Sequence, residues 1–124
     1  MSVVLGVLVG GAIGALSRYG LDVLIERNTV SDFPWATFVV NVAGCLVVGF
    51  IIAALVDRHN APSWLRAALV IGFCGGFTTF STFAQESVDL FEAKLTVLAV
   101  ASISANVVVG IVAVLAGAGL GRRV

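Results

Sequence analysis

Four long apolar segments, separated by short polar stretches, take up almost all of this chain of 124 residues. A helix needs about 20 apolar residues to cross a bilayer, so four such segments and their connections use the whole length. The composition agrees, because 60% of the residues are hydrophobic and 11% are charged, whereas a soluble domain carries roughly twice that charged fraction. We therefore expect an all-α integral membrane protein, with one transmembrane domain over residues 1–124.

The predicted transmembrane helices cover approximately residues 2–25, 34–56, 63–92 and 95–120. The third is too long for a simple span, while its apolar part before Gly75 is too short to cross alone. A break in this helix near Gly75–Thr79 reconciles the two facts. The adjacent glycines there weaken a helix, since each costs about 1 kcal/mol relative to alanine. Backbone carbonyls freed inside a bilayer must then be satisfied by protein, water or an ion.

Charge balance and the few reactive side chains exclude several classes of function. Seven basic and seven acidic residues give a formal net charge of zero, so nothing indicates a nucleic acid partner. Cys45 and Cys74 lie in apolar segments and His59 lies in a polar loop, which does not make a convincing transition-metal site. Among the carboxylates only Asp22 is expected inside a span. No hydrolytic or redox constellation is visible, and we do not expect an enzyme.

Positive side chains are spread almost evenly over the two sides of the predicted bundle. One side has Arg58, Arg66, Arg122 and Arg123, and the other has Arg27 and Lys94, with Arg18 if it reaches the interface. Such a weak bias lets a small protein insert both ways up, so an antiparallel pair of identical subunits is possible. One copy of four thin helices is not expected to enclose a pore. We therefore expect a homodimer.

Small and polar residues recur at helical spacing inside the apolar segments. Gly6, Gly10 and Gly14 form a stripe that lets another helix approach closely. Two further pairs share helix faces, because their members are four residues apart: Thr37 with Asn41, and Ser102 with Asn106. Asn41 either hydrogen-bonds a neighbouring helix or contacts a ligand in a pore, and Thr37 extends its polar line. Arg18 either snorkels to the interface beside Asp22 or draws anions toward a vestibule.

The break in the third segment offers two binding capacities. Unwound backbone over Gly75–Thr78 exposes carbonyl oxygens, which coordinate alkali ions in broken membrane helices. The alternative is that the glycines only allow a tight helix crossing. Phe77, Phe80 and Phe83 then recur every three residues, and the positive edges of their rings can line a path for a small anion. The alternative for the phenylalanines is ordinary packing, and hydroxyls in membrane helices often bond to their own backbone.

Three segments of the chain carry a family likeness. Residues 72–83, GFCGGFTTFSTF, closely resemble the signature of the Fluc (CrcB) fluoride channels. Residues 10–19, GGAIGALSRY, and residues 34–44, PWATFVVNVAG, are similar to the first-helix and second-helix motifs of that family. The likeness covers the whole chain, in order and at the right length.

The resemblance implies a passive, fluoride-selective channel of the bacterial inner membrane, which lowers cytoplasmic fluoride and gives fluoride resistance. Fluoride that entered as the neutral acid would leak out through it. The resemblance also implies a dual-topology, antiparallel homodimer with two pores and a structural sodium ion at its centre. The partners implied are therefore fluoride, sodium, a second copy of the chain and membrane lipid.

The same resemblance suggests roles for individual residues. Phe80 and Phe83 would contact fluoride through their ring edges, and Asn41 would donate a hydrogen bond to it. The path would be extended by Ser81, Thr82, Thr37, Ser102 and Asn106, with Arg18 at the aqueous vestibule. The carbonyls of Gly75 and Thr78, from both subunits, would hold sodium.

Two positions depart from the pattern of this family. The fourth helix of the family often carries a polar track that can begin with a tyrosine, where this chain has Ser102 and Asn106. Ala36 stands where a glycine is common.

Two other classes of function are possible. A small proton-coupled multidrug transporter would share four helices, but it needs a membrane-embedded carboxylate that the first helix lacks before Asp22. A non-conducting accessory subunit that packs through its glycine stripes is the third possibility.

Overall fold

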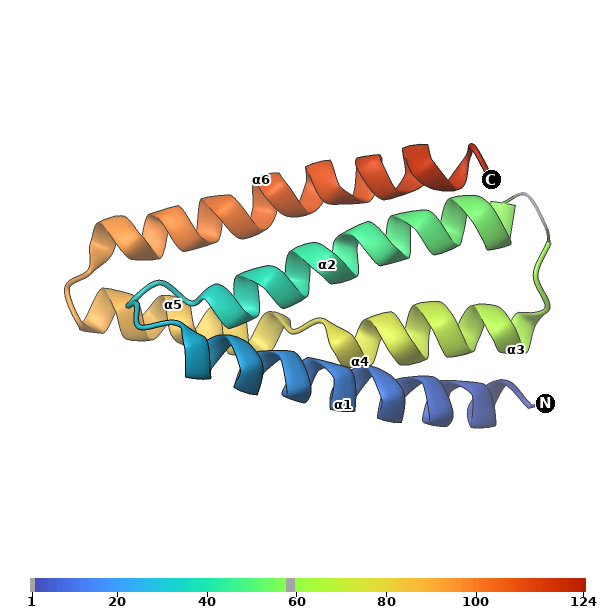
Figure 1. The fold of residues 1–124 in the computed structure, drawn as a ribbon, viewed down its shortest axis with the longest axis horizontal. Helices are drawn as coiled ribbons and strands as arrows, with labels where there is room; N and C mark the ends of the chain where they lie inside the picture. The colour runs from blue at the N-terminus through green and yellow to red at the C-terminus, as the bar shows by residue number, and fades with distance from the viewer. Residues whose placement is uncertain (1, 58–59) are drawn as a thin grey trace.

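The computed structural model describes residues 2–57 and 60–124, which form a bundle of helical rods joined by short turns (Figure 1). The elements are α1 (Val3–Asn28), α2 (Trp35–Ile51), the π-helical η1 (Ile52–Asp57), α3 (Ser63–Arg66), the π-helical η2 (Ala67–Cys74), α4 (Gly75–Phe77), α5 (Phe80–Glu92) and α6 (Thr96–Gly121). Four rods result, each long and apolar enough to cross a membrane: α1, α2 with η1, α3 to α5, and α6. The prediction of four membrane-spanning helices is confirmed.

The observed helix ends lie close to the predicted ones. The first rod begins where Ser2 accepts a hydrogen bond from the Leu5 N–H at 3.2 Å, and it runs about one turn beyond residue 25, to Asn28. The loop predicted between the second and third segments contains Arg58 and His59, which lie outside the described residues. The α5–α6 turn places Lys94 at a φ of 60°.

Glycines hold the rods together as two close pairs, α1 against η2 and α4, and α2 against α6. A Cβ atom at Gly10 would overlap the carbonyl oxygen of Ala68, and one at Gly117 would overlap that of Leu46. Lipid tails are as apolar as leucine, so helices in a membrane associate through such close packing rather than through the hydrophobic effect. The predicted glycine stripe on the first helix is therefore a packing surface, turned toward the third rod.

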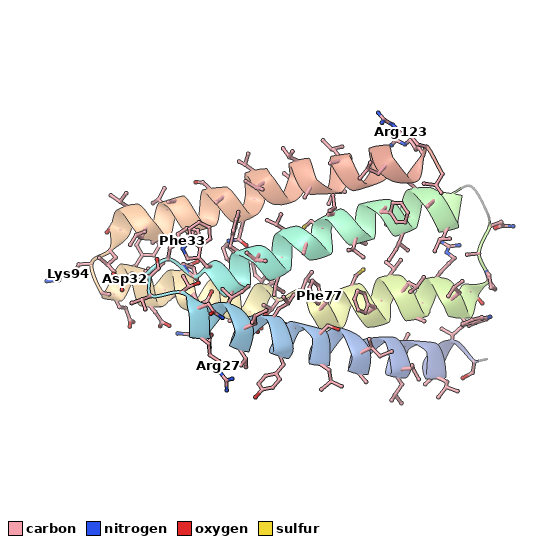
Figure 2. All side chains as sticks on the ribbon, in the orientation of Figure 1. Arg27, Asp32, Phe33, Phe77, Lys94 and Arg123 are labelled. Atoms are coloured by element: carbon pink, nitrogen blue, oxygen red, sulfur yellow. The ribbon has the colours of Figure 1, made fainter. Side chains whose placement is uncertain are left out.

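Charged side chains lie mostly at the two ends of the bundle, as a membrane protein requires. Arg27, Asp32 and Lys94 lie at one end, and Arg123 lies at the other end with both chain termini (Figure 2). Large apolar side chains point outward between the ends, for example Leu16 in the middle of α1, which is 69% exposed. This separation agrees with the two sides predicted from the positive charges.

The third rod is interrupted at two threonines. Thr78 and Thr79 are extended, with ψ angles of 160° and 117°, while Gly75–Phe77 remains helical. The interruption falls inside the predicted range, but after the glycines rather than at them. A Cβ at Gly76 would lie 2.7 Å from the carbonyl oxygen of Gly11, whereas one at Gly75 would meet nothing within 4 Å. Gly76 therefore allows the tight crossing, and Gly75 faces open space.

Candidate functional site: the helix break and its cavity

Side chains of the two threonines close the helix ends at the break. The Thr78 hydroxyl donates to the Cys74 carbonyl at 2.9 Å, and the Thr78 N–H donates to the same oxygen at 3.0 Å. The Thr79 hydroxyl accepts from the Thr82 N–H at 3.2 Å, which is the bond that an N-cap residue makes to the first turn of a helix. The sequence Thr-Thr therefore ends one helix and begins the next without leaving these groups unpaired.

Asn41 of α2 supplies the remaining partners of Thr79. The Thr79 N–H donates to Asn41 Oδ1 at 2.9 Å, and Asn41 Nδ2 donates to the Thr79 carbonyl at 3.1 Å. The same Nδ2 donates to Asn106 Oδ1 of α6 at 3.2 Å, and Asn106 Nδ2 donates to the Ser102 carbonyl at 3.0 Å. An amide nitrogen has two protons, so both protons of Asn41 are engaged. The prediction that Asn41 hydrogen-bonds a neighbouring helix is confirmed. The contact of Asn41 with fluoride stays a prediction.

Arg18 of α1 points into the bundle, toward the break. Its Nη1 donates to the Thr78 carbonyl at 3.3 Å in a partly buried contact. No ion pair forms between Arg18 and Asp22, although both residues are described and lie one turn apart on α1. The predicted pairing of Arg18 with Asp22 is therefore not formed as an ion pair, because Arg18 hydrogen-bonds the Thr78 carbonyl instead. The position of Arg18 at the interface or at a vestibule stays a prediction.

A cavity of about 450 Å³ lies beside the break and is lined by α2, α6 and both halves of the third rod. Its lining contains Asn41, Gly44, Cys45, Val48, Val70, Cys74, Gly75, Thr78, Thr79, Phe80, Phe83, Asn106 and Val107. The rings of Phe80 and Phe83 are tilted by 55°, with centroids 5.7 Å apart. We call this cavity the break cavity. Its lining brings together four of the predicted pathway residues and the two residues, Gly75 and Thr78, that were predicted to bind sodium through their carbonyls.

The predicted stripe of three phenylalanines is wrong for Phe77. This side chain is only 6% exposed and stacks on Phe73, with centroids 5.7 Å apart and an interplanar angle of 8°. Phe80, on the other side of the break, is 79% exposed. Three-residue spacing places side chains on one face only while the helix is continuous, and the extended threonines interrupt that relation.

The other predicted pathway residues lie outside the lining of the break cavity. Ser81 and Thr82 are exposed on α5, where the Thr82 Oγ1 accepts from the Thr79 hydroxyl at 3.0 Å. Thr37 is 3% exposed, and its hydroxyl donates to Glu86 Oε1 at 2.8 Å. Ser102 is fully buried on α6, and its Oγ has no hydrogen-bond partner.

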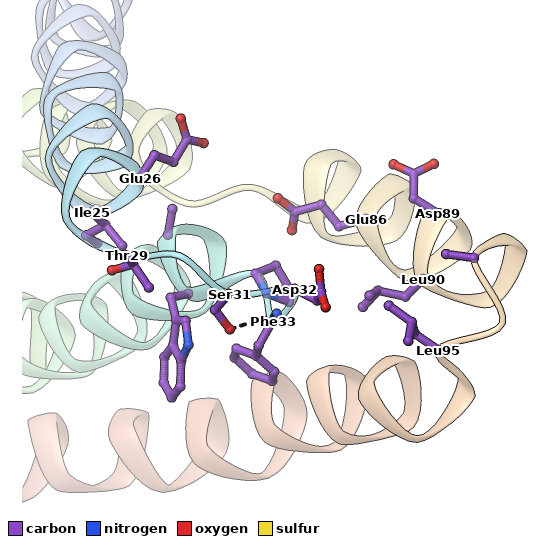
Figure 3. A pocket seen from close by; sticks show the side chains of 14 residues that line it. Ile25, Glu26, Thr29, Ser31, Asp32, Phe33, Glu86, Asp89, Leu90 and Leu95 are labelled. Atoms are coloured by element: carbon purple, nitrogen blue, oxygen red, sulfur yellow. Dashed lines mark hydrogen bonds between the residues drawn. The ribbon is translucent and has the colours of Figure 1, made fainter.

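Glu86 is a polar residue of the bundle interior that was not predicted there from the sequence. Its Oε2 is buried without a partner, and its other oxygen binds Thr37. Figure 3 shows it in a second cavity, of about 400 Å³, between α5 and the turn after α1. The carboxylates that line this cavity belong to Glu26, Asp32, Glu86 and Asp89. The signal was the helical spacing of Phe83, Glu86, Ser87 and Leu90, which marks the inner face of α5.

Backbone carbonyls are the groups at this site that suit a cation. In a continuous helix the Thr79 N–H would donate to the Gly75 carbonyl, but here it donates to Asn41 instead. The Thr78 carbonyl accepts one bond, from Arg18, and a carbonyl has two lone pairs. Among the described residues no group of three or more His, Cys, Asp or Glu side chains is placed to hold a metal ion. The carbonyls of Gly75 and Thr78 thus fit an alkali ion better than a transition metal.

Fold and site together define a multi-pass membrane protein whose third span is interrupted inside the bundle, an arrangement found where membrane proteins bind or conduct ions. The family described as CrcB-like protein, Camphor Resistance (CrcB), matches residues 5–118, and the chain belongs to this family.

Curated relatives match the chain along nearly its full length. A protein of Agrobacterium fabrum named fluoride-specific ion channel FluC is 43% identical over 117 residues, which are 94% of each chain. Proteins of the same name from Phocaeicola vulgatus and Chloroflexus aurantiacus are 40% and 38% identical, covering 94% and 98% of this chain and 96% and 97% of the relatives.

Proposed function

We propose that the protein is a fluoride-selective channel of the bacterial inner membrane, which lets fluoride leave the cytoplasm passively. The observation that carries this proposal is the break cavity. It places the amides of Asn41 and Asn106 and the rings of Phe80 and Phe83 around one space, and no acidic side chain lines it among the described residues. Amide protons and the positive edges of aromatic rings attract a small anion. The names of the relatives point to the same ion.

Asn41 gives the anion a donor that is already in place. One Nδ2 proton binds Asn106 Oδ1 at 3.2 Å, and fluoride entering the cavity would compete with that oxygen for the proton. The exchange of one hydrogen bond for another keeps binding weak enough for the ion to leave, which conduction requires. Thr37 and the unpartnered Ser102 hydroxyl would continue the path along the inner faces of α2 and α6, and Ser81 and Thr82 would continue it on α5.

A second copy of the chain completes the proposed channel. Phe80 is 79% exposed and Gly75 is exposed in one copy, so both residues lie on an uncovered face beside the break. We propose that an antiparallel second copy covers this face and brings its own phenylalanines and carbonyls to it. The carbonyls of Gly75 and Thr78 from both copies would then hold a structural sodium ion, which would fix the two breaks against each other. In that assembly Arg18 would lie at the aqueous vestibule.

The competing functions find less support. A proton-coupled multidrug transporter needs a membrane-embedded carboxylate, and Glu86 is a partly buried carboxylate on the third rod. It binds Thr37 outside the break cavity, however, and the relatives are named as channels. Their names also speak against a non-conducting accessory subunit and against an enzyme.

Growth in fluoride tests the proposal in cells. We expect that expression of the protein restores growth, in acidic medium with fluoride, to a bacterial strain that lacks its fluoride exporters. The reason is that fluoride enters as the neutral acid and dissociates inside, so a passive path for the anion lowers its cytoplasmic concentration. Matched cells in medium without fluoride provide the control. Equal growth inhibition in cells with and without the protein, at equal membrane expression, would contradict the proposal.

A further inference from the structure

The Thr78 carbonyl, one of the two proposed sodium ligands, already has a positively charged neighbour. Arg18 Nη1 donates to this oxygen at 3.3 Å, across 60 residues of sequence and in partly buried surroundings. The guanidinium group carries a permanent charge. The Gly75 carbonyl accepts no side-chain hydrogen bond in the described part of the chain, and the Thr79 N–H, which would reach it in a continuous helix, donates to Asn41 instead. The inference below rests on the sodium site of the proposed function.

The charge of Arg18 is offset only in part. Asp22 lies close enough to Arg18 for an electrostatic attraction but forms no ion pair with it. The break cavity, whose lining includes Gly75 and Thr78, is lined by no acidic side chain among the described residues. A cation held by the Thr78 carbonyl would therefore feel the repulsion of the Arg18 charge. Coulomb repulsion is proportional to the charge of the bound ion, so a divalent ion would feel twice the repulsion of sodium.

We propose that Arg18 determines which cation the break accepts. Its hydrogen bond fixes the orientation of the Thr78 carbonyl, and its charge restricts the site to monovalent ions. In a homodimer each copy brings one Arg18, so the repulsion acts from both sides of the shared site. The same charge weakens the hold on sodium itself, and a neutral side chain that keeps the hydrogen bond strengthens it. Arg18 is thus a positioning residue of the cation site, not a ligand.

The experiment measures bound cations directly, in the purified full-length protein and in two variants. Arg18→Gln removes the charge and keeps an N–H donor, while Arg18→Lys keeps both the charge and a donor. Each protein is loaded with radioactive sodium and separated from free ion, and the rate of sodium release is followed. Parallel samples are stripped of sodium, equilibrated with calcium and assayed for retained calcium.

The expected results differ by variant. Release of sodium from Arg18→Gln should be slower than from the parent by about tenfold or more, because the repulsion is gone. Arg18→Gln should also retain calcium, whereas the parent and Arg18→Lys should not. Sodium release from Arg18→Lys should stay within about threefold of the parent, because the charge remains.

Four results would overturn the inference. The first three are sodium release from Arg18→Gln that is as fast as from the parent, absence of calcium from Arg18→Gln, and calcium retained by the parent as well as sodium. The third is measured on the parent alone, so it decides the matter even if Arg18→Gln does not fold. A parent that carries fluoride but retains no sodium would also overturn it while leaving the channel function intact. Loss of the channel function would instead appear as absent fluoride flux in the parent.

Discussion

Replacing Phe80 by isoleucine should reduce fluoride flux by at least about tenfold, a factor equivalent to about 1.4 kcal/mol, while the protein still folds and assembles. Isoleucine keeps the bulk of the side chain but has no positive ring edge for an anion. Phe80 is 79% exposed in one copy, so its exchange should change the free energy of unfolding of the single chain by only about 0.5 kcal/mol, and the retained bulk of isoleucine should still allow the two copies to pair. The measurement is fluoride release from liposomes that contain equal amounts of parent or variant.

A matched control for this exchange is Phe91→Ile. Phe91 also lies on α5 and is 43% exposed, but it does not line the break cavity. Its replacement should leave the flux within about twofold of the parent, since surface exchanges away from a site have small effects. Unchanged flux in Phe80→Ile would refute the role of the ring edge. Equal loss of flux in both variants would show that any phenylalanine exchange on α5 disturbs the protein.

Replacing Asn41 by alanine should destabilise the protein by about 2–5 kcal/mol, because it leaves the Thr79 N–H and carbonyl without partners. Each buried backbone group that loses its hydrogen bond costs about 1–3 kcal/mol, and water is scarce inside a membrane bundle. The midpoint of thermal unfolding should fall by roughly 10 °C or more. Fluoride flux should be lost as well, because the hydrogen bonds of Asn41 hold Thr79 in its extended conformation at the break.

Asn28→Ala is the control for this prediction. Asn28 also donates one side-chain hydrogen bond to a backbone carbonyl, that of Leu24 at 2.7 Å, but at an exposed helix end. Its loss should cost no more than about 0.5 kcal/mol. If Asn41→Ala unfolds at the same temperature as Asn28→Ala, the hydrogen bonds of Asn41 to Thr79 do not stabilise the break.

Features that depend on local periodicity were predictable from the sequence. The four spans follow from the length of the apolar segments, and the stripe of Gly6, Gly10 and Gly14 follows from four-residue spacing. The break was predictable to within a few residues, because a segment of this length with polar residues at its centre does not fit one straight span. Its position at Thr78 and Thr79 was not, since it depends on Asn41, which lies 38 residues away.

Features that depend on contacts between distant segments were not predictable. Arg18 and Asp22 share a face of α1, which suggested a pair, but the Thr78 carbonyl on another rod takes the hydrogen bond. Phe77 has the spacing of Phe80 and Phe83, yet the change in backbone direction at Thr78 separates it from them. Only Asp22 among the carboxylates was expected inside a span, so Glu86 was not, and only the packing of α5 against α2 brings it to Thr37. The resemblance supplied the fluoride and sodium roles, which remain predictions.

Anion selectivity in a purified system tests the central claim most directly. Liposomes that contain the protein are loaded with potassium fluoride or potassium chloride. A potassium ionophore is added so that potassium leaves together with the anion and no membrane potential opposes the loss of the anion. We expect rapid loss of fluoride and no loss of chloride above that of protein-free liposomes. Equal rates of loss for fluoride and chloride, or no loss of fluoride at all, would contradict a fluoride-selective channel.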